Sequence, residues 1–198
     1  MKRILFLSFF LGLYLLLPLG EGWGGVSFAQ KGAPEGMMNN IRAKYAEAWE
    51  MVKQQLQDDI TPNKNYMTAT LHYVIPACGQ TTETLSYYYL LDDNNESGEM
   101  AYNLYLVTRK YNVAVRNFYE EYLYDTNTAH CLFVYKKYDI YAGDGIESAE
   151  ERYYMHDGQI IWKTLSENAQ VDEEEENRVK KACYSIMQGF AYVVNHSF

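Results

Sequence analysis

The four histidines are the side chains best suited to acid–base chemistry or metal binding near neutral pH: His72, His130, His156 and His196. His156 lies in the stretch ERYYMHDGQIIWKT, residues 151–164, directly before Asp157-Gly158. That dipeptide favours a two-residue hairpin turn, which places His156 opposite Gln159 at an exposed tip. No two histidines are spaced four residues apart, and the HExxH pattern is absent. We therefore expect no metal site and no catalytic residue among the histidines.

Other patterns that carry chemistry are incomplete. Residues 93–98 (DNNESG) match the first half of a calcium loop, but the twelfth position, which should hold a bidentate glutamate, is Leu104. His130 and Cys131 are neighbours in an expected strand, so their side chains point to opposite faces. There is no GxSxG, SxxK or phosphate loop. The sequence thus predicts a protein that is not an enzyme and that carries no cofactor.

Tyrosine, with 20 of 198 residues, is the residue type that offers most to a ligand. Alternation along the expected strands puts Tyr88, Tyr105 and Tyr154, together with Arg152, on the sheet face away from the helices. Tyrosines on an open face can stack on sugars or form a protein-binding surface. The alternative is an aromatic-rich sheet that closes on itself as a second core. These four residues are the candidate ligand-binding set.

The first 29 residues resemble a secretory signal peptide. Basic residues at positions 2 and 3 precede an apolar run over residues 4–19, and Ser27 and Ala29 are small residues suited to cleavage after Ala29. An uncleaved anchor is the alternative, but this run is shorter than the about 20 residues that a span needs. We expect a single domain over residues 30–198 in the periplasm or outside the cell, with no membrane span.

The chain is acidic, with a formal net charge of −9, which disfavours nucleic acid as a partner. Its three cysteines are Cys78, Cys131 and Cys183. An exported location permits a disulfide, but the odd number leaves at least one thiol outside any internal pair. The sequence leaves open whether any two of them form a disulfide.

The hydrophobic pattern predicts an α+β fold: an N-terminal helix, roughly seven antiparallel strands in a curved meander, and a C-terminal helix. Apolar residues recur at helical spacing from Met38 to Leu56 and again from Val179 to Val194. Between them the period is two, and strands are expected at about 66–76, 82–91, 100–109, 112–124, 130–141, 149–156 and 159–165. Short connections favour antiparallel neighbours, and both helices are expected on one face of the sheet.

The turn at Asp157-Gly158 also predicts the register of the last hairpin. Tyr153 should lie opposite Trp162, which places Trp162 in the core and the next residue, Lys163, on the outer face.

The segment EERYYMHDGQIIWK resembles the hairpin of small exported bacterial, Bacteroidetes-like, envelope proteins of uncharacterised function. The resemblance covers residues 118–163 and consists of aromatic and turn residues. It implies an envelope location and no particular activity.

These observations favour an exported, non-catalytic binding or structural protein. It would use an aromatic sheet face to hold a protein, a glycan or a lipidic ligand. The alternative is a secreted or periplasmic hydrolase whose site is assembled from distant residues.

Overall fold

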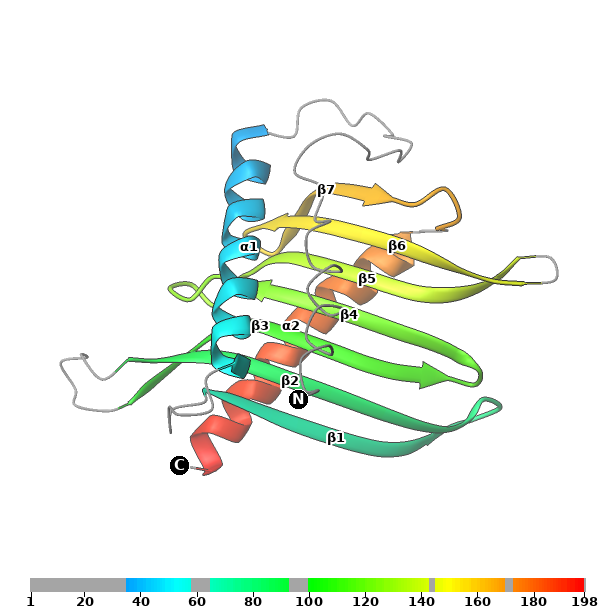
Figure 1. Cartoon of the computed structure of the whole chain (residues 1–198), viewed down its shortest axis with the longest axis horizontal. Coiled ribbons are helices and arrows are strands. Elements are labelled where there is room, and N and C mark those ends of the chain that lie inside the picture. The colour runs from blue at the N-terminus through cyan, green and yellow to red at the C-terminus, as the bar shows by residue number, and fades with distance from the viewer. Residues whose placement is uncertain (1–34, 58–64, 93–99, 143–144, 170–172, 198) are drawn as a thin grey trace, which may run out of the picture.

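The computed structural model describes residues 35–57, 65–92, 100–142, 145–169 and 173–197. One helix precedes seven strands and a second helix follows them (Figure 1). The elements are α1 (Glu35–Gln57), β1 (Tyr66–Ile75), β2 (Gly79–Asp92), β3 (Ala101–Val113), β4 (Arg116–Tyr124), β5 (Cys131–Ala142), β6 (Gly145–His156), β7 (Gln159–Leu165) and α2 (Glu173–Ser197). The strands form one antiparallel sheet in chain order. The α+β meander expected from the sequence is confirmed.

The two helices pack on opposite faces of this sheet, so the expectation that they share one face is wrong. Tyr88 and Leu123 belong to the core under α1, whereas Tyr87 and Tyr122 belong to the core under α2. Figure 1 shows α1 in front of the strands and α2 behind them. The physical reason lies in consecutive apolar positions along β2, β3 and β4. Because neighbouring side chains point to opposite faces, such runs leave two apolar faces to be covered.

The apolar stripes of both helices face the sheet as expected, except that Leu56, at the end of the expected α1 stripe, is exposed. Ile41, Ala48 and Val52 of α1 are buried, and so are Val179 and Phe190 of α2. The acidic run that opens α2 suits the positive end of the helix dipole.

One turn was placed wrongly by the sequence pattern. The strands β3 and β4 are joined at Ala114 and Val115, several residues later than expected. Ala114 has a positive φ of 53°, a backbone conformation usually given to glycine or asparagine. The side-chain amide of Asn112 donates a hydrogen bond to the Ala114 carbonyl at 3.3 Å and supports the turn. Without Gly, Pro, Asn or Asp at its centre, this turn carries no sequence signal.

The last hairpin follows the expected register only next to its turn. Asp157 and Gly158 have positive φ angles of 48° and 73°, and His156 pairs with Gln159. His156 is exposed, as expected.

A bulge then shifts the pairing of this hairpin, so that Tyr154 faces Trp162 and Tyr153 faces Lys163. Trp162 therefore packs with the α1 core. Lys163 reaches Glu176 of α2 at 2.6 Å, so the outer position expected for it is wrong.

No helix in the described part of the chain is long and apolar enough to cross a membrane. The expected signal peptide, residues 1–29, and the calcium-like segment, residues 93–98, lie outside the described residues.

Candidate functional site

The structure puts the three candidate tyrosines on one face, as alternation requires, but that face is not open at their position. Tyr88, Tyr105 and Tyr154 are only 8%, 2% and 1% exposed and pack under α1. Arg42 of α1 donates a hydrogen bond to the Tyr154 hydroxyl at 3.2 Å. The expectation that these tyrosines line a face away from the helices is therefore wrong. In the structure they form part of the core.

Arg152, the fourth candidate, is partly exposed beside this core. Its guanidinium donates to Glu150 at 2.7 Å and lies 5.0 Å from the centre of the Tyr135 ring. The structure thus does not bring Arg152 and the tyrosines together around an accessible site.

An accessible site lies further along the same face. The helix α1 crosses the strands near one of their ends, and no other described helix or strand covers this face toward the hairpin tips (Figure 1). There the sheet borders an open surface hollow of about 640 Å³. We call this hollow the sheet groove.

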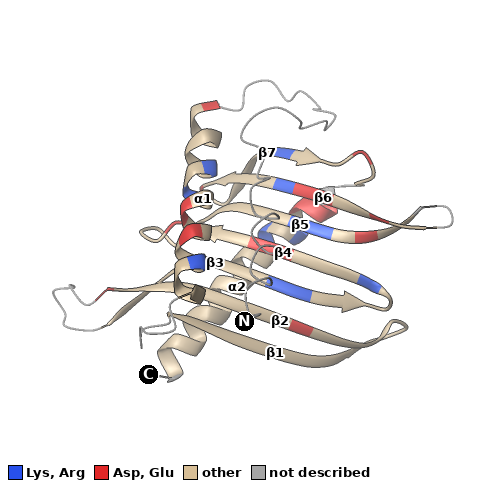
Figure 2. Ribbon diagram, viewed as in Figure 1, with Lys and Arg blue, Asp and Glu red and all other residues tan. Residues whose placement is uncertain are grey.

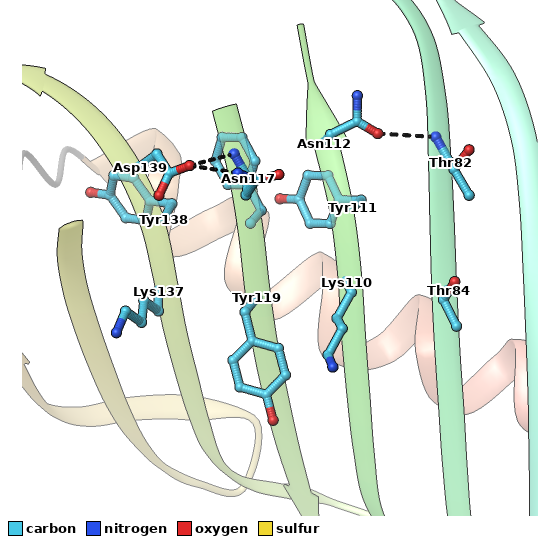
Figure 3. A pocket seen from close by; sticks show the side chains of 11 residues that line it. Thr82, Thr84, Lys110, Tyr111, Asn112, Asn117, Tyr119, Lys137, Tyr138 and Asp139 are labelled. Atoms are coloured by element: carbon cyan, nitrogen blue, oxygen red, sulfur yellow. Dashed lines mark hydrogen bonds between the residues drawn. The ribbon is translucent and has the colours of Figure 1, made fainter. Parts of the chain in front are cut away.

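Two rows of side chains run across the strands in the sheet groove (Figure 3). The inner row, set by the pairing of β2 to β5, is Thr84, Lys110, Tyr119 and Lys137. The outer row, nearer the hairpin tips, is Thr82, Asn112, Asn117 and Asp139. Both rows come from alternate positions of their strands, which is why they share a face.

The outer row is held in place by hydrogen bonds. Asn117 donates to Asp139 from its backbone and its side-chain amide, at 3.0 and 2.8 Å. The backbone N–H of Thr82 donates to the Asn112 side chain at 3.2 Å. These contacts fix two amide groups at the rim of the sheet groove.

The inner row centres on Tyr119, with a lysine on each neighbouring strand. The ammonium of Lys110 lies 5.6 Å from the centre of the Tyr119 ring and has no ion pair with a described carboxylate. Lys137 is 4.0 Å from Glu150, at the limit of an ion pair. Two positive charges therefore border one aromatic ring on an exposed surface.

The hydroxyl of Tyr119 connects the sheet groove to α1. Burial and the neighbouring carboxylate of Glu121, which accepts its hydrogen bond, raise the pKa of Tyr119 far above its ordinary value. Glu121 also accepts hydrogen bonds from Tyr45 and Trp49 of α1. Burial raises the pKa of Glu121 despite these three donors. Tyr119 is thereby held in a fixed orientation at the centre of the site.

A stack of rings supports the sheet groove from the other face of the sheet. The rings of Tyr111 and Phe118 are 4.8 Å apart and nearly parallel, and Phe118 stacks on Tyr138 at 5.8 Å. Stacked rings on three neighbouring strands, β3, β4 and β5, thus lie directly behind the sheet groove.

Buried carboxylates on the α2 face form a separate network. Arg109 bridges Glu83 and Glu120 at 2.7 and 3.1 Å, and the hydroxyls of Tyr111 and Tyr122 donate to Glu120. Burial opposes ionisation of Glu83, but the hydrogen bonds from Arg109 and Tyr73 outweigh it and hold its pKa below the ordinary value. Charged and polar partners thus stabilise these carboxylates inside the fold.

The sequence held a weak signal for the sheet groove. Polar side chains at alternate positions, such as Lys110 and Asn112 or Lys137 and Asp139, mark one solvated face of β3 and β5. The pattern does not show how far α1 extends over that face.

Comparison with known proteins adds no family to this geometry. No protein-family model matches the chain, and no curated protein or solved structure is significantly similar to it.

Proposed function

We propose that this protein is an exported, non-catalytic binding protein whose sheet groove holds a small acidic saccharide. The observation that carries the proposal is the inner row, in which Lys110 and Lys137 stand on either side of Tyr119. Export rests on the signal-like sequence of residues 1–29.

The charge of the sheet groove supports an anionic ligand. The whole chain has a formal net charge of −9, yet β3 and β5, the two strands that flank β4, each carry a lysine into the open part of the sheet (Figure 2). These two lysines outnumber Asp139, the one carboxylate among the described residues that line the sheet groove. Because Lys110 has no carboxylate partner among the described residues, its charge is available to a ligand. A carboxylate or sulfate between the two lysines would receive charge-assisted hydrogen bonds.

The other lining groups favour a ligand rich in hydroxyls. Thr84 and Asn117 offer a hydroxyl and an amide group that both donate and accept hydrogen bonds. The amide of Asn112 is already used by Thr82 and Ala114 and helps to shape the rim. The Tyr119 ring adds an apolar surface with a polar tip, which suits the mixed character of a sugar ring. A few convergent polar groups around an aromatic centre are typical of small-molecule sites.

The proposal is tested by calorimetric titration of the exported protein with uronic-acid oligosaccharides and with their neutral counterparts. We expect the acidic ligands to bind more tightly, and their affinity to fall with added salt because exposed charges are screened. Lys110→Ala and Lys137→Ala should each weaken binding of the acidic ligand about 5- to 50-fold, in keeping with loss of one charged hydrogen bond.

The matched control is Lys53→Ala, since Lys53 lies on α1 and contacts Glu50 at 3.5 Å, away from the sheet groove. This variant should bind like the wild type. Equal affinity for neutral and acidic saccharides, or equal effects of all three substitutions, would contradict the proposal.

The alternative function is a hydrolase that uses the same groove. The observation in its favour is Glu121, a buried carboxyl behind the groove that accepts a hydrogen bond from the lining residue Tyr119 and whose pKa is raised by burial. It would act on a ligand through Tyr119. Such an enzyme would release products from an acidic oligosaccharide and lose turnover, with binding retained, on Glu121→Gln. If the wild-type protein binds the oligosaccharide but leaves it intact, the hydrolase is excluded for that substrate.

A further inference from the structure

The strand β1 forms one edge of the sheet and pairs, among the described elements, only with β2. Its sequence YMTATLHYVI contains no charged residue, no proline and no glycine. Its pairing with β2 runs over ten residues without a bulge. Such a long, regular and uncharged edge presents unpaired backbone groups that are ready to join another strand.

The opposite edge lacks these properties. The strand β7 has seven residues, includes Lys163, and is interrupted by a bulge in its pairing with β6. Short length, charge and bulges are features by which proteins protect an edge strand from further pairing. The contrast shows that the unprotected edge is a property of β1 rather than of the whole sheet.

Apolar side chains are exposed on both faces of β1. Leu71 is 49% exposed and Val74 is 72% exposed. Tyr73 is also exposed, although its hydroxyl donates to Glu83 at 2.7 Å. Exposed apolar residues together with an open backbone edge favour burial against another strand.

We propose that β1 is a dimerisation edge, which pairs antiparallel with β1 of a second copy of this chain and has Thr70 opposite its own counterpart. In that register Leu71 faces Ala69 of the other copy, and Tyr73 faces Met67. On the other face, Thr68 meets His72 and Tyr66 meets Val74. Polar residues thus meet polar residues around the centre, and the exposed apolar side chains are covered.

The same kind of pairing already exists between β1 and β2. The Thr68 and Ser86 hydroxyls are 3.2 Å apart, and Nδ1 of His72 lies 3.1 Å from the Thr82 hydroxyl. His72 therefore keeps Nε2 for the second copy's Thr68. The row of hydroxyl and imidazole groups would continue across the dimer, which is why a second copy, rather than an unrelated peptide, fits this edge.

Symmetry determines the form of the dimer. Because equivalent residues meet, the contact is a closed two-fold interface. Its axis runs perpendicular to the sheet, so that both sheet grooves open on the same side. The product is one continuous sheet of two meanders.

The first test is the mass of the exported protein in solution, measured by light scattering after size exclusion at a protein concentration of about 100 µM. We expect a dimer for the wild type and for Thr70→Ser, and a monomer for Thr70→Lys, which places two like charges opposite each other. A monomeric wild type at this concentration overturns the proposal, and so does a Thr70→Lys protein that remains dimeric.

The second test fixes the register by cross-linking in a Cys78→Ser background, which removes the exposed cysteine. Thr70→Cys should form an intermolecular disulfide on incubation with oxidised glutathione, because directly opposed residues lie within the Cα distances that a disulfide spans. Val74→Cys is the matched control. In this register its sulfur lies about 25 Å from its counterpart, since each residue advances a strand by about 3.3 Å. Equal cross-linking of the two variants, or none with Thr70→Cys, overturns the pairing.

Discussion

At the scale of single residues, buried carboxylates separate into two groups with opposite responses to pH. Glu120 and Glu121 are adjacent in β4, so one joins the Arg109 network on the α2 face and the other lies beneath α1. Among the described residues, Glu121 accepts hydrogen bonds from the neutral side chains of Tyr45, Trp49 and Tyr119, and the more distant charge of Arg152 offsets only part of the effect of burial on its pKa. Glu83, by contrast, is paired with the guanidinium of Arg109. The first environment disfavours a charge and the second favours it.

Replacement of Glu121 by glutamine should therefore change how stability depends on pH. Burial raises the pKa of Glu121 in the folded protein, so its stabilising contribution is complete below the unfolded pKa and is lost as pH rises through the folded pKa. Gln cannot ionise. Relative to the wild type, the free energy of unfolding of Glu121→Gln should rise from pH 4 to pH 8, by about 1.4 kcal/mol per unit of pKa shift. Urea denaturation across this range measures it.

Glu83→Gln is the comparison for that experiment. The pKa of Glu83 is lowered because Arg109 and Tyr73 outweigh the effect of burial. Its contribution is therefore present above the unfolded pKa and is lost as pH falls through the folded pKa. Relative to the wild type, the free energy of unfolding of Glu83→Gln should be lowest at neutral pH and should approach the wild-type value as the pH falls. Parallel pH profiles for the two variants would contradict at least one of the two assignments, and the direction of the shared change would show which one.

At the scale of elements, bulges decide which side chains face which helix. One bulge lies between Tyr88 and Tyr89 of β2, and another between Tyr154 and Met155 of β6. The second turns Trp162 toward α1 and Lys163 toward α2.

Substitutions in β7 test the position of this bulge. Trp162 is partly buried in the α1 core, so Trp162→Ala should lower the free energy of unfolding by about 2 kcal/mol, somewhat less than the 3–5 kcal/mol of a fully buried aromatic. In a double-mutant cycle, Lys163→Ala and Glu176→Ala should show a coupling of about 0.2–1 kcal/mol. Chemical denaturation of the variants gives both values.

His156→Ala serves as the control in the same hairpin. His156 is exposed at the tip, so its substitution should change stability by no more than about 0.5 kcal/mol. No coupling between Lys163 and Glu176, or a loss in His156→Ala equal to that in Trp162→Ala, would mean that the hairpin is paired differently.

The elements also show what the sequence could and could not give. The strands, their order and the tip at Asp157-Gly158 follow from periodicity and turn chemistry. The bulge in the same hairpin does not, because Ile161, the unpaired residue, carries no local signal such as glycine. Sequence parity correctly grouped Tyr88, Tyr105 and Tyr154, but it could not tell that α1 covers them. The sequence pattern did not predict the sheet groove for the same reason, because the groove lies where α1 no longer covers the sheet.

At the scale of the whole molecule, the sequence contained a signal for the packing of the two helices on opposite faces of the sheet. The strands β2 and β4 carry apolar residues at consecutive positions, Tyr87-Tyr88-Tyr89 and Tyr122-Leu123-Tyr124, and so need a packing partner on both faces of the sheet.

The three cysteines are all free thiols: Cys131 and Cys183 are buried in the α2 core, while Cys78 is exposed.

Export remains a prediction at this scale. If residues 1–29 are a signal peptide, the mature protein begins at Gln30, because Ser27 and Ala29 provide the small residues that precede a cut. Intact-mass spectrometry of the exported protein should give the mass of residues 30–198. Recovery of an exported form that still carries residues 1–29 would contradict it.

The order of the strands also has a consequence for how the chain reaches its native state. Every strand pairing joins chain neighbours, so the sheet can form without closing a long loop. The distant contacts belong to the helices: the hydrogen bond between Arg42 and Tyr154 spans 112 residues, and that between Lys44 and Asp125 spans 81. The contacts within the meander therefore join residues that are close in sequence, whereas the packing of α1 on the sheet joins residues that are far apart in sequence. We therefore expect the sheet to assemble hairpin by hairpin, and its tyrosine-rich faces to stay exposed until the two ends of the chain close over them.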